Sequence, residues 1–143
     1  MLDSINIRSN VAVYLQIENT VQFAIASGKL KDGDQLPSVR ELSNRLNVNP
    51  NTAAKAYRDL EVMGLLFTRR GMGVYIKKDV RSKCREECNR KIFSRLHEVV
   101  AEAKASGMSK KDILDGVNTS FPIADKPYDE TPKAVLSLSK SKK

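Results

Sequence analysis

Residues 37–52 read PSVRELSNRLNVNPNT, and this stretch decides the fold. Ser38 and Glu41 have the three-residue spacing of a capping box, in which each side chain accepts from a backbone N–H that would otherwise be unpaired. We therefore expect a helix that begins after Ser38 and runs to about Leu46. Residues 47–49 then interrupt it, because asparagine favours turns and tolerates the left-handed backbone conformation.

A second helix is predicted directly after this break. Asn49 is a favourable N-cap, and Pro50 suits the first turn, where its missing N–H costs nothing. Gly64 ends the helix. Its apolar face consists of Ala53, Ala56, Tyr57, Leu60 and Met63. Two helices joined by so short a turn are a helix-turn-helix candidate.

The flanking segments indicate the winged variety of this motif. Residues 11–26 carry apolar side chains at three- and four-residue steps, which predicts an amphipathic helix that ends near Gly28. Residues 65–68 and 74–76 are short β-rich runs on either side of the basic, glycine-containing loop 69–73, and such an arrangement predicts a β-hairpin. The expected fold class is therefore mainly α with a small β-hairpin, a winged helix-turn-helix.

The composition is that of a basic, globular protein. Of 143 residues, 41% are hydrophobic and 29% are charged, so the chain can bury a core. The 25 Lys and Arg against 17 Asp and Glu give a net charge of +8, which makes nucleic acid the first partner to test. No apolar run reaches the about 20 residues of a membrane span, the N-terminus lacks a secretory pattern, and two cysteines fit a reducing compartment. We expect a cytoplasmic protein with no membrane partner.

Motifs of catalysis and cofactor binding are not found in the sequence. It contains no Gly-rich phosphate loop that opens a helix, no metal-spaced acidic cluster and no nucleophile–base pair, and its single histidine speaks against a multi-histidine metal site. Residues 71–73, Gly-Met-Gly, form a hairpin turn rather than a nucleotide fingerprint. We expect no enzymatic activity, no cofactor and no metal.

The start of the second predicted helix is suited to contact base edges in the DNA major groove. A recognition helix inserts its first turn there, which requires small polar side chains. Three residues meet this requirement: Asn49, Asn51 and Thr52. Lys55 and Arg58 lie off the apolar face, where they could reach the phosphate backbone. Arg69 and Arg70 bring charge to a wing beside the minor groove, and Gly71 lets the chain come close.

Several short motifs lie between residues 12 and 78. They are Tyr14-Leu15-Gln16-Ile17, Gly28-Lys29-Leu30, GDQLPSVREL at 33–42, Val48-Asn49-Pro50-Asn51-Thr52, Ala56-Tyr57, Leu60-Glu61, Gly64-Leu65 and Arg69-Arg70-Gly71-Met72-Gly73. Together they resemble the DNA-binding domain of the GntR family of bacterial transcription regulators. The resemblance assigns the family's DNA-contacting arginine to Arg40 and its wing glycine to Gly71. For Arg40, a salt bridge to Glu41 or Asp59 is the alternative.

The resemblance completes the predicted set of DNA-binding residues. That set is Ser38, Arg40, Asn49, Pro50, Asn51, Thr52, Lys55, Arg58, Arg69, Arg70 and Gly71. Ser38 is interpreted first as a helix cap, although its hydroxyl could also contact DNA. Three positions depart from the family pattern: Asp32 stands where Pro is frequent, Asn47 where Gly is frequent, and Ala53 where Val is frequent. Because Asn tolerates a left-handed backbone, we expect the fold to be kept.

The second half is predicted to be helical. Residues 80–106 contain no Pro or Gly and carry an apolar stripe, which Gly107 ends. The stripe consists of Cys84, Cys88, Ile92, Leu96, Val99 and Ala103, widened by Phe93 and Val100. Ser109 is the expected N-cap of a short helix that runs to about Asn118. From Ser120 onwards we expect a mobile tail.

This organisation predicts three parts. They are a winged helix-turn-helix at 1–79, a helical dimerisation region at 80–119 and a flexible basic tail at 120–143. The predicted dimerisation contacts are Ile92, Phe93, Leu96, Val99, Val100 and Ala103. So short a second half resembles the small YtrA-like branch of the family, whose two C-terminal helices serve dimerisation and whose members mostly repress transcription.

Cys84 and Cys88 have two interpretations. Two such pairs meeting in a dimer would give four sulfurs for a metal or a redox switch. Alternatively, both are small buried side chains on the packing stripe, which we favour because free cysteine is among the most buried residue types. His97 lies about half a turn around the helix from Cys88 and adds no ligand to such a site.

We therefore expect sequence-specific binding of double-stranded DNA at an inverted-repeat operator by a homodimer that represses transcription. The sequence leaves three alternatives: a sequence-tolerant architectural DNA-binding protein, a sensor of thiol-reactive agents, metals or small molecules, and an interaction module whose basic tail binds acidic partners. An unidentified small-molecule effector is a further partner that it leaves open.

Overall fold

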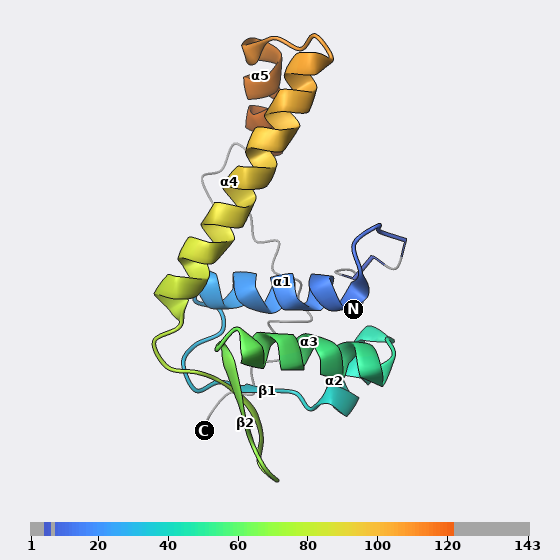
Figure 1. The fold of residues 1–143 in the computed structure, drawn as a ribbon, viewed down its shortest axis with the longest axis vertical. Helices are drawn as coiled ribbons and strands as arrows, with labels where there is room; N and C mark the ends of the chain where they lie inside the picture. Colours follow the sequence, from blue (N-terminus) through green and yellow to red (C-terminus); the bar gives the residue numbers. More distant parts are fainter. Residues whose placement is uncertain (1–4, 7, 122–143) are drawn as a thin grey trace. The chain divides into compact units, whose positions relative to one another are not determined.

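The computed structural model describes residues 5, 6 and 8–121. These residues form two compact units, one up to Cys88 and the other from Asn89 onwards. Figure 1 shows the fold as a ribbon. In chain order the elements are α1 (Val13–Ala26), β1 (Gln35–Leu36), α2 (Val39–Leu46), α3 (Pro50–Val62), β2 (Leu66–Arg69), β3 (Gly73–Ile76), α4 (Arg81–Ala105) and α5 (Lys110–Ser120). The predicted winged helix-turn-helix fold is confirmed.

The first unit is built around α3, which contacts both α1 and α2 (Figure 1). Its apolar face closes the core, where Ala53, Ala56 and Leu60 are fully buried. The other buried hydrophobic residues are Ile17, Val21, Ala24, Ile25, Leu30, Leu36, Leu42, Leu46, Tyr57, Leu65, Leu66, Ile76, Val80, Cys84 and Cys88. Residues from α1 to the start of α4 therefore share one core.

The predicted caps of the two central helices are present. The Ser38 hydroxyl oxygen accepts from the Glu41 N–H at 3.1 Å, and the Glu41 carboxylate accepts from the Ser38 N–H at 2.8 Å, which completes the capping box. Asn47 ends α2 in the left-handed conformation, with φ 52° and ψ 48°. Asn49 then caps α3, because its Oδ1 accepts from the Asn51 N–H at 2.8 Å. These local interactions fix the turn between the helices.

The wing contains one strand more than the sequence predicted. The hairpin of β2 and β3 is present, and β1 pairs antiparallel with β3, so that the strand order is β1-β3-β2. Gln35 lies opposite Tyr75, and Leu36 lies opposite Val74. A strand of two residues is too short to show an alternating pattern, which is why it could not be predicted from the sequence.

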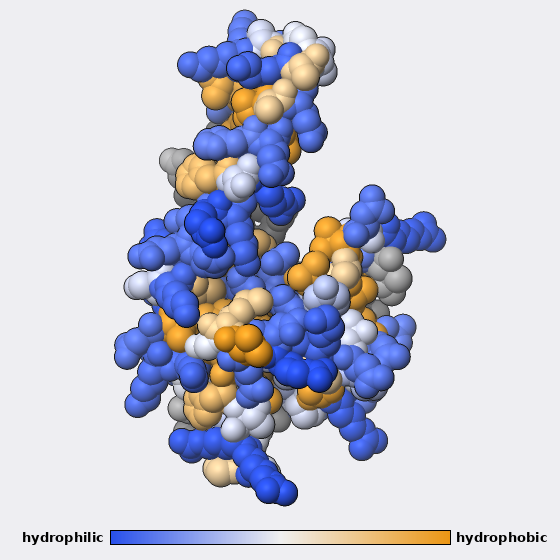
Figure 2. All heavy atoms as spheres, viewed as in Figure 1, coloured by the Kyte–Doolittle hydropathy of each residue, from blue (hydrophilic) through white to orange (hydrophobic). Residues whose placement is uncertain are grey.

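The second unit is helical. The boundary between the units falls after Cys88, within α4, so the second unit contains the rest of α4 and α5. Gly107, with φ 88°, ends α4. The Ser109 hydroxyl and the Asp112 carboxylate form the predicted cap of α5, and this hydrogen bond lowers the pKa of Asp112. None of the described residues from Asn89 to Phe121 is buried, and Figure 2 shows hydrophobic residues at the surface of this unit among the hydrophilic ones. Among the described helices, none is both long and apolar enough to cross a membrane.

Candidate nucleic-acid interface

The first turn of α3 presents small polar residues on the surface. Asn49, Pro50 and Asn51 are exposed, and Thr52 is half-buried. The cap uses Oδ1 of Asn49, which leaves its side-chain N–H groups available as donors. The side chain of Asn51 can both donate and accept, and backbone N–H groups at a helix N-terminus favour anions. This turn can therefore bond to base edges and to phosphate.

Two further exposed residues, Ser38 and Arg40, lie at the start of α2. The capping box confirms that Ser38 is a cap, and its hydroxyl hydrogen remains a donor. The two carboxylates proposed as alternative partners of Arg40 have other partners, since Glu41 accepts from the Ser38 N–H and Asp59 accepts from Lys55. These contacts favour a surface role for Arg40.

A buried tyrosine connects α3 to the start of α2. Tyr57 is buried in the core, and its hydroxyl donates to the Pro37 carbonyl oxygen at 2.8 Å. Burial raises the pKa of Tyr57 well above its ordinary value, so the phenol stays protonated and remains a donor. Because Pro37 precedes Ser38, this bond fixes the start of α2 relative to the recognition helix.

Lys55 has intramolecular partners that the sequence analysis did not identify. Its Nζ lies 2.8 Å from the Asp59 carboxylate and 4.3 Å from the centre of the Tyr14 ring. The hydrogen bond with Asp59 raises the pKa of Lys55, and the same bond lowers the pKa of Asp59. The four-residue spacing of the pair was the available signal. To contact a phosphate, Lys55 would have to release Asp59. Arg58 is also exposed on the same helix.

The tip of the wing carries exposed Arg69, Arg70 and Gly71. Gly71 has φ 76°, and no heavy atom would lie within 4 Å of a Cβ added there. The positive φ is what requires glycine at this position. Arg69 lies over the paired rings of Phe67 and Tyr75, at 5.7 and 5.9 Å from their centres. The wing therefore displays basic side chains, of which Arg69 rests on two aromatic rings.

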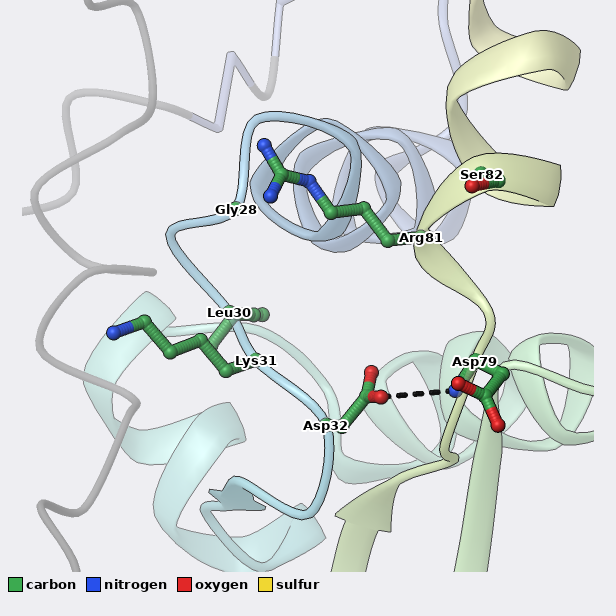
Figure 3. Close-up of a pocket in the computed structure, with 7 residues that line it drawn as sticks. All are labelled: Gly28, Leu30, Lys31, Asp32, Asp79, Arg81 and Ser82. Carbon is green, nitrogen blue, oxygen red and sulfur yellow. Dashed lines mark hydrogen bonds between the residues drawn. The ribbon is translucent and has the colours of Figure 1, made fainter.

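A cavity of about 500 Å³ lies in the first unit, where α4 begins (Figure 3). Its lining residues are Gly28, Leu30, Lys31, Asp32, Asp79, Arg81 and Ser82. Asp32, one of the three departures from the family pattern, accepts from the Asp79 N–H at 2.9 Å. The Arg81 side chain lies over Gly28 and donates to the Ala26 carbonyl oxygen at 3.4 Å. These bonds attach the start of α4 to the end of α1.

Cys84 and Cys88 are free and buried. The Cys84 sulfur lies 3.2 Å from the Gln22 carbonyl oxygen of α1. Within the described part of the chain, no three His, Cys, Asp or Glu residues are grouped so that they could hold a metal ion. Both cysteines are part of the core of the first unit.

A winged helix-turn-helix with an exposed polar recognition turn and a basic wing defines a DNA-binding protein. Comparison with known proteins narrows this class, because residues 13–76 match the model of the bacterial regulatory proteins of the gntR family. The chain is 33% identical over 114 residues to the HTH-type transcriptional regulator YhcF of Bacillus subtilis, covering 78% of this chain and 92% of the relative. It is 36% identical over 110 residues to the HTH-type transcriptional repressor YtrA of the same organism, covering 77% and 85%.

A solved structure also indicates the GntR family. A GntR family transcriptional regulator from Listeria monocytogenes aligns with a TM-score of 0.63 and 33% identity, covering 78% of this chain and 96% of that chain. The protein belongs to the GntR family and is a DNA-binding transcriptional regulator. Both named relatives are HTH-type transcriptional regulators.

Proposed function

We propose that the protein represses transcription as a homodimer that binds an inverted-repeat operator. The observation that carries this proposal is an exposed apolar stripe on α4. Four large side chains of the stripe are exposed: Ile92 by 47%, Phe93 by 58%, Leu96 by 42% and Val99 by 59%. Val100 and Ala103 beside them are half-buried. A row of this length on one helix needs a covering surface, because apolar area in water is unfavourable.

The rest of the second unit, as far as the structure describes it up to Phe121, is too small to provide this cover. Helix α5 offers Ile113, Leu114 and Val117, and of these Leu114 and Val117 are themselves 50% and 40% exposed. A second copy of the same chain would supply a matching stripe through a two-fold interface. Two-fold symmetry of the dimer then gives symmetric half-sites in the DNA.

The division into parts follows the same reasoning. We assign DNA binding to residues 1–79 and dimerisation to residues 80–119. The first two turns of α4 bury Cys84 and Cys88 in the core of the first unit, so the free part of the stripe begins at Ile92. The predicted basic tail lies almost wholly in 122–143, outside the described residues.

DNA contact is proposed through three groups of exposed or half-buried residues and through two further exposed residues of α3 that contact phosphates. The recognition turn and Arg40 at the start of α2 set the register and the base preference, and the wing contacts the backbone beside the minor groove. The residues are Asn49, Pro50, Asn51 and Thr52 in the first group, Ser38 and Arg40 in the second, Arg69, Arg70 and Gly71 in the third, with Lys55 and Arg58 on phosphates. The name of the relative YtrA, a transcriptional repressor, supports repression as the outcome.

The test compares base contacts with phosphate contacts. DNA selected by the protein from a random pool and a random-sequence duplex are titrated over a series of salt concentrations. Arg40→Ala and Thr52→Ala should each weaken binding to the selected DNA by about 1–3 kcal/mol and bring it closer to the random duplex. Lys55→Ala should weaken both duplexes alike and lower the salt slope by about one. Equal losses on both duplexes for Thr52→Ala would contradict its role as a base-reading residue.

A further inference from the structure

Two side chains from outside the wing loop hold the loop at its tip. The Met72 carbonyl oxygen accepts from Gln35 Nε2 at 3.0 Å and from the Tyr75 hydroxyl at 3.0 Å. Gln35 belongs to β1 and lies 37 residues before Met72, so this bond connects the loop to a distant segment. Within the loop, the Met72 N–H donates to the Arg69 carbonyl oxygen at 2.9 Å. Both polar groups of the Met72 backbone are therefore satisfied within the wing.

The backbone beside this carbonyl leaves space for the glutamine. Gly73 has φ 121°, and a Cβ added to it would lie 2.6 Å from Gln35 Nε2. A side chain at this position would force the Gln35 amide to move, so the amide occupies space that glycine leaves open. The positive φ of Gly73 also favours glycine there.

Tyr75 connects the loop to the proposed DNA-contacting arginines. Its ring stacks on Phe67 with 5.5 Å between the ring centres, and the guanidinium of Arg69 lies over both rings. Gln35 pairs with Tyr75 across β1 and β3. One cluster therefore sets both the course of the loop that carries Arg70 and the direction of Arg69.

The strand that carries Gln35 is fixed to the recognition helix. Pro37 directly follows β1, and its carbonyl oxygen accepts from Tyr57 of α3. The path from Tyr57 through Pro37 to Gln35 and Met72 consists of two side-chain hydrogen bonds and a short piece of backbone. This path joins the recognition helix to the tip of the wing.

We infer that Gln35 is a positioning residue, which fixes the tip of the wing relative to the recognition helix and so orders Arg69 and Arg70 for DNA contact. This inference rests on the proposed contact between the wing and DNA. Side chains that are ordered before binding lose less entropy on contact, and the cost avoided corresponds to about two- to tenfold in affinity for each immobilised long side chain.

The test uses the full-length protein and a duplex that it selects from a random DNA pool. Gln35→Met keeps the length and neutrality of the side chain and removes the donor, and Tyr75→Phe removes the other donor while keeping the ring. Each variant is titrated over a salt series, alone and combined with Arg69→Ala and Arg70→Ala. Thermal unfolding midpoints control for loss of fold.

Gln35→Met should weaken binding about three- to tenfold and make the salt dependence shallower, because fewer phosphate contacts are kept. Tyr75→Phe should act in the same direction. With both arginines replaced, Gln35→Met should have no further effect, an outcome that a merely structural role would not give. Unchanged affinity and salt slope in both donor variants, or an undiminished loss in the arginine-free background, would overturn this inference alone. If the arginine substitutions themselves left DNA binding unchanged, this result would overturn both the proposed wing contact and the inference.

Discussion

The first two turns of α4 and the turns that follow belong to one helix and carry one apolar stripe, but their environments differ. Cys84 and Cys88 are 2% and 4% exposed, whereas Phe93 and Val99 are 58% and 59% exposed. The first pair packs against a core that also includes residues of α1 and α3. The sequence pattern is continuous across this change. Helical periodicity therefore identifies which side chains share a face, and it does not identify what covers that face.

The largest effect is expected from charging the exposed part of the stripe. Leu96→Asp together with Val99→Asp should turn the proposed dimer into a monomer, because two charges would be buried in the interface. Loss of the linked second half-site should lower operator affinity about 10²–10⁴-fold. Sedimentation equilibrium and operator titration at fixed salt measure the two effects. Ser94→Asp, on the same helix away from the stripe, is the matched control, and a double variant that stays dimeric would contradict the assignment.

A core substitution should instead act on folding. Leu60 is fully buried in α3, so Leu60→Ala should lower the free energy of unfolding by about 2–5 kcal/mol. Val62 is 84% exposed on the same helix and serves as the control. Val62→Ala should change the free energy of unfolding by less than about 0.5 kcal/mol. Denaturant unfolding at a fixed protein concentration measures both. Similar losses for the two variants would mean that the core is placed incorrectly.

Substitution of the cysteines tests whether the core of the first unit includes the start of α4. Cys84→Ala should cost about 1–2 kcal/mol of unfolding free energy, since it removes a buried side chain, and should leave operator affinity of the folded protein nearly unchanged. Zinc or peroxide should affect binding only weakly. The thiol-sensor alternative would gain support if the parent released DNA on either treatment while the Cys84→Ala, Cys88→Ala double variant stayed bound.

A similarly small effect is expected from changing a single backbone conformation. Asn47 has φ 52° and ψ 48°, so Asn47→Ala should cost about 1–2 kcal/mol in strain, while Asn47→Gly should be close to neutral. Thermal unfolding of the two variants measures the difference. Equal stability of the alanine and glycine variants would show that α2 ends without this left-handed residue.

The features that the sequence predicted correctly depend on residues close together in the chain. The capping box of Ser38 and Glu41, the left-handed Asn47 and the cap at Asn49 each involve at most a few neighbouring residues. The confirmed wing hairpin is local in the same sense. Propensity and spacing are sufficient for such features because their partners are set by the chain itself.

The features that could not be predicted from the sequence depend on distant segments or on very short ones. Strand β1 has two residues, and its pairing with β3 joins positions 40 residues apart. The bond from Gln35 to the Met72 carbonyl and that from Tyr57 to Pro37 exist only once the helices and the wing have packed. The pair of Lys55 and Asp59 is different, because its four-residue spacing was visible in the sequence.

The stoichiometry and symmetry of the DNA complex test the central claim most directly. The protein selects binding sites from a random DNA pool, the sites are sequenced, and the mass of the complex on the best site is measured by sedimentation. We predict two half-sites in inverted orientation, with two chains bound to each duplex. A single unpaired motif bound by one chain would contradict it.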